Sequence, residues 1–532
     1  MDATDLARWQ FAITTVYHFL FVPITIGLSF VVAVFHTQWV RTHNPDWLRL
    51  AKFFGKLFTI NFALGLVTGI VQEFQFGMNW SAYSRFVGDI FGAPLAIEAL
   101  LAFFLESVFL GLWIFGWGRI PEKLHASTMW IVHVGTLLSA YFILAANSFM
   151  QHPVGFRFNP VSGRAELTDF FAVLTNKVQL VTFPHVAFSA YMVGGGVLMG
   201  VALHLMRRES LRASALLRSV DGLDSTATSD RSAGRDIDGG DSTGTTAAMT
   251  MTTQARQATA ARADVPLYRK AARIGAVLTL VAGVGVAVSG DLQGKIMTEV
   301  QPMKMAAAEA LYETSPQGAG APFSVLTIGS LDGQHANALI EIPGLLSFLG
   351  TGTWDGEVKG INDLKAQYAA TYGATGDPRL VDAATDYVPN IPTTYWTFRL
   401  MIGVGMAAAG IAALVLWTTR RGRVPTSRWV LYAAIAAPLL PVFGNSFGWI
   451  FTEVGRQPWA VFGLMTTASG VSPSVSIGEV ITSMTVFTLL YGALAVVEIK
   501  LFLAYVRRGA EPFEAPATPS DEDEDAPLAF AY

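Results

Sequence analysis

The chain has 532 residues, of which 52% are hydrophobic and only 14% are charged. Soluble domains carry roughly 25% charged residues, so the composition argues against an unusually apolar soluble enzyme and favours a membrane protein. The net charge of −4, without a Gly-rich phosphate loop or a basic surface, gives no indication of nucleic-acid binding. Because there is no cysteine, disulfides, thiolate nucleophiles and Cys-ligated iron–sulfur clusters are excluded, and a redox cofactor must be held by His, Met or carboxylate.

Apolar segments long enough to cross a hydrocarbon core of about 30 Å as helices recur along the whole chain. In order they are residues 11–36, 53–76, 93–117, 126–148, 181–206, 271–291, 395–417, 429–451 and 476–505. The first is too long for the apolar part of a signal peptide, so we interpret it as a membrane span. The expected fold class is an all-α integral membrane protein, a bundle of nine transmembrane helices.

Basic residues predict how this bundle is oriented, because Lys and Arg near span ends favour the cytoplasmic side. With the N-terminus outside and the C-terminus in the cytoplasm, most of them fall on the cytoplasmic side. The pairs Arg207–Arg208, Arg420–Arg421 and Arg507–Arg508 are examples.

Polar segments divide the chain further. The expected parts are spans one to five in 1–212, a loop in 213–264, span six in 265–291, a loop in 292–394, spans seven to nine in 395–508 and a tail in 509–532. Residues 213–264 are rich in Ser, Thr, Ala, Gly and Asp, so we expect a disordered, dispensable cytoplasmic loop. Residues 292–394 contain apolar clusters and should form a structured functional loop outside. The acidic tail is expected to be solvated in the cytoplasm.

Ionisable side chains inside a bilayer are costly and usually functional. On the predicted topology His18, His185, Met401 and Glu453 reach the outer third of the membrane from four different spans, as expected for cofactors held between helices. Taken singly, each histidine could instead bond a neighbouring helix, and a methionine usually serves packing. His133 lies deeper and is interpreted as a structural or proton-path residue.

Glu98 and Glu106 share the third span eight residues apart, which places them about 2.2 turns and 12 Å from each other on one helix face. Such a file of carboxylates can relay protons inward from the cytoplasm. The alternative is a pair of hydrogen bonds to neighbouring helices.

The histidine count narrows the kind of redox protein. Only His18, His133 and His185 are available away from the ends of the predicted spans, one on each. These are too few for a haem–copper oxidase core, and their spacing does not match a dihaem quinol cytochrome. Any haem would therefore also need Met and carboxylate ligands.

At this point several segments resemble subunit I of the cytochrome bd-type quinol oxidases. The most specific is Glu453–Trp459, which contains the family's GRQPW signature with a Glu two residues before it. The other matching segments are Arg8–Phe11 with His18, Glu73–Gly77, Asn79–Ser81, Asn147–Pro153, Gly290–Asp291 and Trp396–Met401. The resemblance covers essentially all of the predicted spans.

The resemblance implies haem ligands. His185 and Met401 would be the axial pair of a low-spin haem b, in which both iron positions are filled, so that it transfers electrons without binding oxygen. His18 would ligate haem d, or a b haem in its place, and Glu453 a high-spin haem b. Within the family these two ligand positions can be exchanged. Further residues assigned to haem surroundings are Arg399, Arg456 and Trp449.

The loop in 292–394 resembles the family's quinol-binding loop. Lys304 and Glu309 occupy the matching positions, where they would hydrogen-bond the quinol head group and Glu309 would accept its proton. Without the resemblance, an ordinary solvated ion pair would be the preferred interpretation. Glu98 would lie near the oxygen-reducing iron and Glu106 would supply protons. The interval from Lys304 to Met401 is shorter than in the family's long-loop members.

The implied function is that of a respiratory terminal oxidase in the bacterial cytoplasmic membrane. It would oxidise quinol at the outer face and reduce oxygen to water with cytoplasmic protons, generating proton motive force without pumping. Expected partners are subunit II, small single-span accessory subunits, quinol, oxygen and the lipid bilayer, and no nucleic acid. The rival interpretations are a secondary transporter, which would be colourless, and an assembly subunit without haem.

Overall fold

The computed structural model describes residues 3–232, 242–316, 318–329, 336–373, 377, 379–381 and 385–514. Within these residues nine helical stretches are long and apolar enough to cross a membrane. They are α1 (Ala3–Thr42), α2 (Pro45–Met78), α3 to α4 (Ser81–Phe115), α5 (Glu122–Gln151), α7 (Lys177–Ser232), α8 (Ser242–Val300), α12 (Ile391–Thr418), α13 (Arg428–Val454) and α15 (Ile477–Arg508). The expected all-α architecture is confirmed.

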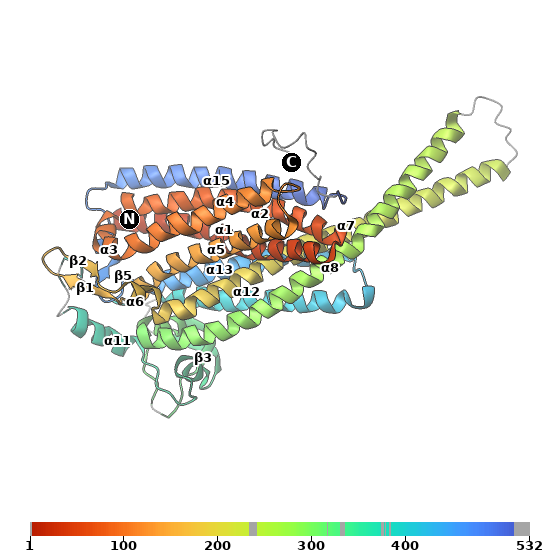
Figure 1. Cartoon of the computed structure of the whole chain (residues 1–532). Coiled ribbons are helices and arrows are strands. Elements are labelled where there is room, and N and C mark those ends of the chain that lie inside the picture. The colour runs from red at the N-terminus through yellow and green to blue at the C-terminus, as the bar shows by residue number, and fades with distance from the viewer. Residues whose placement is uncertain are drawn as a thin grey trace.

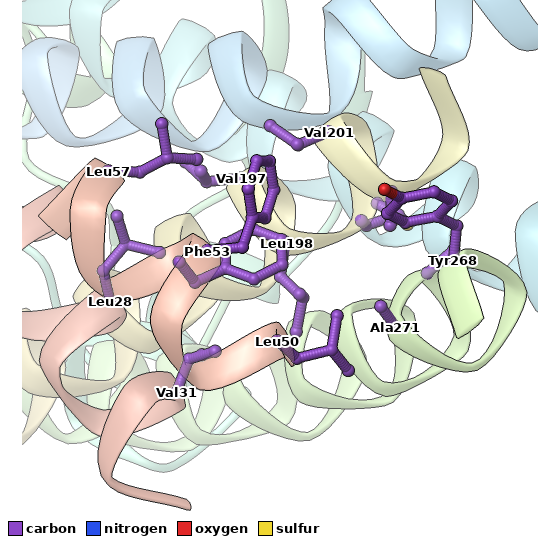
Figure 2. Packing of buried hydrophobic residues seen from close by; sticks show 14 of the residues in the cluster. Leu28, Val31, Leu50, Phe53, Leu57, Val197, Leu198, Val201, Tyr268 and Ala271 are labelled. Atoms are coloured by element: carbon purple, nitrogen blue, oxygen red, sulfur yellow. The ribbon is translucent and has the colours of Figure 1, made fainter. Parts of the chain in front are cut away.

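Burial separates central helices from peripheral ones. In the most apolar window of α7, 72% of the residues are buried, against 11% in α15, which runs along one edge of the bundle (Figure 1). The largest core cluster joins α1, α2, α7 and α8 through side chains such as Leu28, Phe53 and Leu198 (Figure 2). Helices with one buried face and one apolar exposed face fit a bundle surrounded by lipid or by partner helices.

The central helices α1 and α7 approach at glycines. An ideal Cβ added to Gly27 would lie 2.6 Å from Gly194 Cα, which is too close for any side chain. Small residues of this kind let membrane helices pack backbone against backbone. The contact fixes the relative height of α1 and α7, which both carry candidate ligands.

Local signals in the sequence explain several helix starts. Asn44 accepts a hydrogen bond from Asp46 N ahead of α2, and Asn390 accepts one from Thr393 N ahead of α12. Ser476 and Glu479 form a capping box at the start of α15, each side chain bonding the other's backbone N–H. These caps satisfy the free N–H groups of a first turn.

The third span is not a uniform α-helix. Between α3 (Ser81–Ile97) and α4 (Phe103–Phe115), residues Glu98–Ala102 form a π-helical turn. A wide turn of this type rotates the side chains that follow it and is frequent at functional sites. The first residue of this π-helical turn is Glu98, one of the two carboxylates predicted to relay protons.

Short elements cover the end of the bundle at which α1 begins (Figure 1). They are the two-stranded antiparallel sheets β1–β2 (Phe156–Asn159, Arg164–Leu167), β3–β4 (Phe323–Gly329, Ala336–Ile342) and β5–β6 (Trp459–Val461, Met465–Thr466), with helices α6 (Phe170–Leu174), α9 (Pro302–Glu309), α10 (Leu345–Thr351), α11 (Ile361–Tyr368) and α14 (Thr467–Gly470). A π-helical turn, Ala369–Gly373, follows α11, and a 3-10 turn, Arg420–Gly422, lies between α12 and α13. A second core cluster, including Tyr83, Phe149 and Trp459, supports this end. The segment 292–394 therefore forms short helices and strands where it is described.

The described parts of the segment 213–264, residues 213–232 and 242–264, are helical, where disorder was predicted. Helix α7 continues to Ser232 and α8 begins at Ser242, so the pair projects beyond the bundle as a helical hairpin (Figure 1). Ala213 and Ala258 are buried, and Ser219 Oγ lies 3.0 Å from Gln254 Oε1 across the hairpin. The segment has too few large apolar residues to build a hydrophobic core of its own. Two helices can nevertheless pair through small residues such as Ala213 and Ala258. Of the acidic tail, residues 515–532 lie outside the described residues.

Candidate functional site

Helix α13 lies among the three other helices that carry predicted ligands. Its Trp449 stacks on Phe19 of α1, with ring centroids 5.0 Å apart. Its Asn445 accepts a hydrogen bond of 2.8 Å from Ser189 Oγ of α7. An ideal Cβ added to its Gly448 would lie 2.8 Å from Met401 Sδ of α12. Helix α13 therefore contacts α1, α7 and α12 along a single stretch of about one turn, from Asn445 to Trp449.

These contacts bring the predicted ligands to one level of the bundle. His18 precedes Phe19, His185 lies one turn before Ser189, and Met401 rests against α13 itself. Glu453 lies on α13, one turn beyond Trp449. All four residues are partly buried. Two imidazoles and a thioether thus lie on helices that contact α13 between Asn445 and Trp449, and the carboxylate lies on α13 itself.

Both candidate histidines are held through Nδ1. His18 Nδ1 lies 3.0 Å from Thr68 Oγ1 of α2, and His185 Nδ1 lies 3.2 Å from Ser289 Oγ of α8. Among the described residues no hydrogen bond is made by Nε2 of either ring. Such an imidazole can bind a metal through Nε2 while its other nitrogen is oriented by a neighbour.

Glu453 is held by two donors. Asn147 Nδ2 of α5 donates to Oε1 at 2.8 Å, and Arg456 Nη2 donates to Oε2. Arg456 Nη1 also donates to the carbonyls of Trp459 and Ala460. The GRQPW segment therefore folds back on the carboxylate that precedes it, which fixes the direction of the Glu453 side chain.

Two buried donors beside this carboxylate have no hydrogen-bond partner within the described part of the chain. They are Arg456 Nε and Trp449 Nε1. Buried polar atoms are normally satisfied, so unpaired ones indicate a missing acceptor. A haem fits this site: the donor set suits iron, and the carboxylate groups of a haem suit an Arg donor. No group of three His, Asp or Glu suited to a bare metal ion occurs in the described ranges.

Lys304 of α9 is fully buried beside the same carboxylate. Its Nζ donates to Gln151 Oε1 at the end of α5, at 2.5 Å, and Gln301 Nε2 donates to the same oxygen at 2.9 Å. Burial lowers the pKa of Lys304 to about 7, helped by the charge of Arg456 and opposed by Glu453. This lysine can therefore gain or lose its proton near neutral pH.

Glu309, at the other end of α9, is paired with Arg399 of α12. Arg399 Nη2 donates to Glu309 Oε2 at 2.6 Å, and the two side chains are 9% and 1% exposed. Burial raises the pKa of Glu309 to about 7, against the opposing effect of Arg399. Its Oε1 is buried without a partner among the described residues. Lys304 and Glu309 are thus not the solvated ion pair considered above, and each has its own partner.

Arg399 holds the loop against the helix that bears Met401. Besides Glu309 it donates to the carbonyl of Ala308 and, through Nε at 3.0 Å, to the carbonyl of Ser324. All three of its donor nitrogens therefore contact the loop. A direct contact of Arg399 with a haem carboxylate stays a prediction.

The two carboxylates of the third span both face α5, as their shared face predicts. Ser139 Oγ donates to Glu98 Oε1 at 2.7 Å, and an ideal Cβ added to Gly135 would lie 2.8 Å from Glu106 Cγ. Gly135 and Ser139 are one turn apart on α5, a rise of about 6 Å. Glu98 and Glu106 are also within electrostatic range of each other.

His133 has the structural surroundings that its depth suggested. Its Nδ1 lies 2.9 Å from Ser29 Oγ and its Nε2 lies 3.1 Å from Tyr191 OH. Because both ring nitrogens have partners, this histidine offers no free lone pair. It differs in this respect from His18 and His185.

The family model described as cytochrome bd terminal oxidase subunit I matches residues 6–223 and 242–510. The chain belongs to this family. It is 43% identical over 514 residues to the cytochrome bd ubiquinol oxidase subunit 1 of Bacillus subtilis (strain 168), covering 96% of this chain and 95% of the relative. It is 33% identical over 560 residues to the cytochrome bd-II ubiquinol oxidase subunit 1 of Escherichia coli (strain K12), covering 97% and 98%.

Two further comparisons agree. A putative cytochrome bd menaquinol oxidase subunit I of Bacillus subtilis (strain 168) is 25% identical over 511 residues, covering 96% of this chain and 97% of the relative. The solved bd oxidase of Geobacillus thermodenitrificans superposes with a TM-score of 0.74 at 25% identity, covering 95% of this chain and 99% of that one. The resemblance and the helical membrane fold inferred from the sequence are confirmed, and the chain is a multi-pass membrane subunit of a terminal oxidase.

Sequence reasoning missed several residues of this bd oxidase subunit. Thr68 and Ser289 orient the candidate histidines, but a lone Thr or Ser in an apolar helix carries no signal of such a contact. Asn147 and Gln151 could have been suspected from the sequence, because both lie in the Asn147–Pro153 segment that matches the family. That match identified the segment without indicating which side chains it supports.

Proposed function

We propose that the chain is the haem-bearing subunit of a respiratory quinol oxidase that couples quinol oxidation at the outer face to reduction of oxygen to water. The observation that carries this proposal is the convergence of His18, His185, Met401 and Glu453 around α13, next to the buried α9 of the loop. A membrane subunit with such a ligand set and an adjoining polar site suits electron transfer from a quinol.

The residues suggest how haem is divided among them. His185 of α7 and Met401 of α12, on two helices that both contact α13, would hold the low-spin haem b. His18 and Glu453 would hold the high-spin haem d and haem b, with a b haem in place of d as the variant. When bound, these groups supply the redox centres and the iron that takes up oxygen. Asn147 and Arg456 hold Glu453, and Trp449 packs beside His18's helix.

The quinol site lies on α9. Glu309 is ionised in part at neutral pH and can accept a proton from a quinol hydroxyl, and Lys304 can donate a hydrogen bond to its oxygen. Arg399 and Gln151 keep the two side chains in place. The names of the relatives include both ubiquinol and menaquinol, so the proposal extends to the quinol class and no further.

The sidedness of the reaction follows from the distribution of Lys and Arg, which supports an N-terminus outside and a C-terminus in the cytoplasm of a bacterium. Quinol protons would then be released outside, and protons for water would come from the cytoplasm past Glu106. This separation generates proton motive force without a pump. The apolar exposed faces of α15 and the third span, with 11% and 17% of their windows buried, suit subunit II, small accessory subunits and lipid.

The purified complex should be coloured, and it should consume oxygen when supplied with a short-chain quinol. A reduced-minus-oxidised optical spectrum would show b-type haem and, where haem d is present, a band further to the red. A colourless complex would instead support the transporter interpretation, and haem retained after loss of His18, His185 and Met401 would support an assembly role.

Replacing Glu106 with Gln should slow oxygen reduction roughly 100-fold, because a proton donor is lost from the dry face that Glu106 shares with α5. The KM for quinol should stay unchanged, since α9 is untouched. Steady-state oxygen uptake checks both values. Asp89→Asn is the matched control, an exposed carboxylate at the start of the same span. Turnover in Glu106→Gln equal to that of the control would rule out this proton route.

A further inference from the structure

The hydroxyl groups that contact His18 and His185 each donate a hydrogen bond to a backbone carbonyl of their own helix. Thr68 Oγ1 donates to the carbonyl of Gly65 at 2.9 Å, and Ser289 Oγ donates to the carbonyl of Gly285 at 2.7 Å. A hydroxyl has a single proton, so an oxygen that donates it to the carbonyl acts toward the imidazole as an acceptor. His18 and His185 must then carry their proton on Nδ1, which leaves the lone pair on Nε2.

Each of these hydroxyl residues is followed by glycine. An ideal Cβ added to Gly69 would lie 3.2 Å from His18 Cε1, and one added to Gly290 would lie 3.2 Å from His185 Cε1. Few Cβ atoms come this close to a neighbouring atom. A larger residue would push each ring edge away from its hydroxyl partner, so the glycine leaves the imidazole room to lie against the helix backbone.

The His18–Thr68 and His185–Ser289 contacts lie at equivalent positions of two helical hairpins. His18 and His185 each precede, by nine residues, the glycines Gly27 and Gly194 at which α1 and α7 touch. Three spans lie between α1 and α7 along the chain, so these two helices, the first and fifth spans, run in the same direction. Each histidine faces the second helix of a hairpin, α2 in one case and α8 in the other. A motif that recurs at matching positions of two hairpins is unlike a chance contact.

His133 shows which feature distinguishes the motif. Its Nδ1 also contacts a serine whose hydroxyl donates to a carbonyl, Ser29 to Ile26 at 2.9 Å. However, Tyr191 OH occupies its Nε2 side. For His18 and His185, in contrast, the described residues provide no hydrogen-bond partner for Nε2.

We propose that the pairs Thr68–Gly69 and Ser289–Gly290 are positioning elements that fix the tautomer and the ring orientation of two haem-ligating histidines. This inference rests on the proposed haem ligation by His18 and His185. The hydroxyl acts through the imidazole: by accepting the Nδ1 proton it makes Nε2 a stronger electron donor, which favours oxidised iron. Each pair should therefore set the midpoint potential of its own haem.

The test is a redox titration of the purified complex, followed by the haem spectrum. Ser289→Ala should raise the midpoint potential of the haem bound by His185 and leave the others in place. Thr68→Val should do the same for the haem bound by His18. Affinity for that haem should fall about 10- to 100-fold, measured as haem transfer to an excess of apomyoglobin. Ser289→Thr and Thr68→Ser, which keep the hydroxyl, should restore both values.

Matched controls separate positioning from general packing. Thr279→Val on α8 removes a buried hydroxyl that also donates to a helix carbonyl, at 2.9 Å, but contacts no histidine. Gly290→Ala should shift the spectrum of the same haem as Ser289→Ala, whereas Gly283→Ala should not, since its Cβ meets only Met192 Cε at 3.8 Å.

Potentials unchanged in Ser289→Ala and Thr68→Val, or shifted equally in Thr279→Val, would overturn the inference. The histidine variants show whether the proposed function fails with it. If His185→Ala loses a haem while Ser289→Ala behaves as wild type, only the positioning role is wrong. If His185→Ala keeps all haem, the ligation itself is wrong.

Discussion

Replacing His185 with alanine is expected to remove one b-type haem from the complex and to reduce quinol-dependent oxygen uptake to near background. In the proposed ligation the imidazole of His185 supplies the nitrogen ligand, and Met401 alone would be a weak ligand. The loss should appear as one missing b-type component in the reduced-minus-oxidised spectrum. It should also appear as a lower ratio of extracted haem to protein.

The matched control is His204→Ala, on the same helix about five turns beyond His185 and close to Arg208. It should keep the full haem spectrum and near-normal uptake. If both histidine variants lost the same haem, the effect would be a failure of α7 to pack, and the ligand assignment would lose its support.

Met401→Leu tests the other side of the same axial pair. Leucine nearly preserves the volume that rests against Gly448 but has no thioether, so the haem should be retained on His185 and lose its low-spin spectrum. Met406→Leu, which changes a 70% exposed methionine on the same helix, should have no spectral effect. A low-spin spectrum that survives in Met401→Leu would assign the sixth ligand to another residue.

Which parts of the fold could be predicted from sequence depended on the physical signal available. Apolar runs identified all of the spans because lipid demands continuous hydrophobicity. The third span was predicted to begin at residue 93, yet α3 begins at Ser81. The difference arises because Arg85 and Asp89 interrupt the apolar run, while Tyr83 and Phe86 still bury one helix face in the second core cluster.

The sequence suggested candidate ligands for the site but not the side chains that hold them in place. His18, His185 and Glu453 were conspicuous because an ionisable group inside a bilayer needs a reason. Met401 was weak evidence by itself, since methionine in an apolar helix is usually packing. The role of Thr68 and Ser289 could not be predicted from the sequence, because it depends on which helix lies opposite each residue. Only the packing of α1 on α2 and of α7 on α8 determines that.

The loop of residues 292–394 shows the same division. Resemblance indicated Lys304 and Glu309, but spacing alone suggested a solvated pair. The structure buries both and gives them different partners, Gln151 and Arg399, on different membrane helices. Burial of two opposite charges without a mutual contact is costly unless each has a function or a partner of its own. This arrangement makes the loop, and Glu309 within it, the place where the largest effect on quinol oxidation is expected.

Glu309→Gln should lower kcat/KM for quinol at least about 100-fold while leaving the haem spectrum intact, because the amide keeps the shape of the side chain but cannot accept a proton. The control is Glu341→Gln, an exposed carboxylate of β4 in the same loop, which should be neutral. Stopped-flow reduction of the complex by quinol measures the effect directly. Loss of haem from Glu309→Gln would indicate that the Arg399 contact is structural and that the residue's catalytic role is not tested by that variant alone.

The pH dependence of kcat/KM for quinol separates a catalytic role of Glu309 from a structural one, because it depends on the protonation of the side chain. Glu309 has a pKa raised to about 7, so the ionised, proton-accepting form increases as the pH rises toward that value, and kcat/KM of the wild type should rise with it. Above about 7, Lys304 loses its charge and kcat/KM should fall again. In Glu309→Gln the rising part of the curve should disappear while the falling part remains. A variant that kept the rising part would assign the proton acceptor to a different group, since no amide titrates in this range.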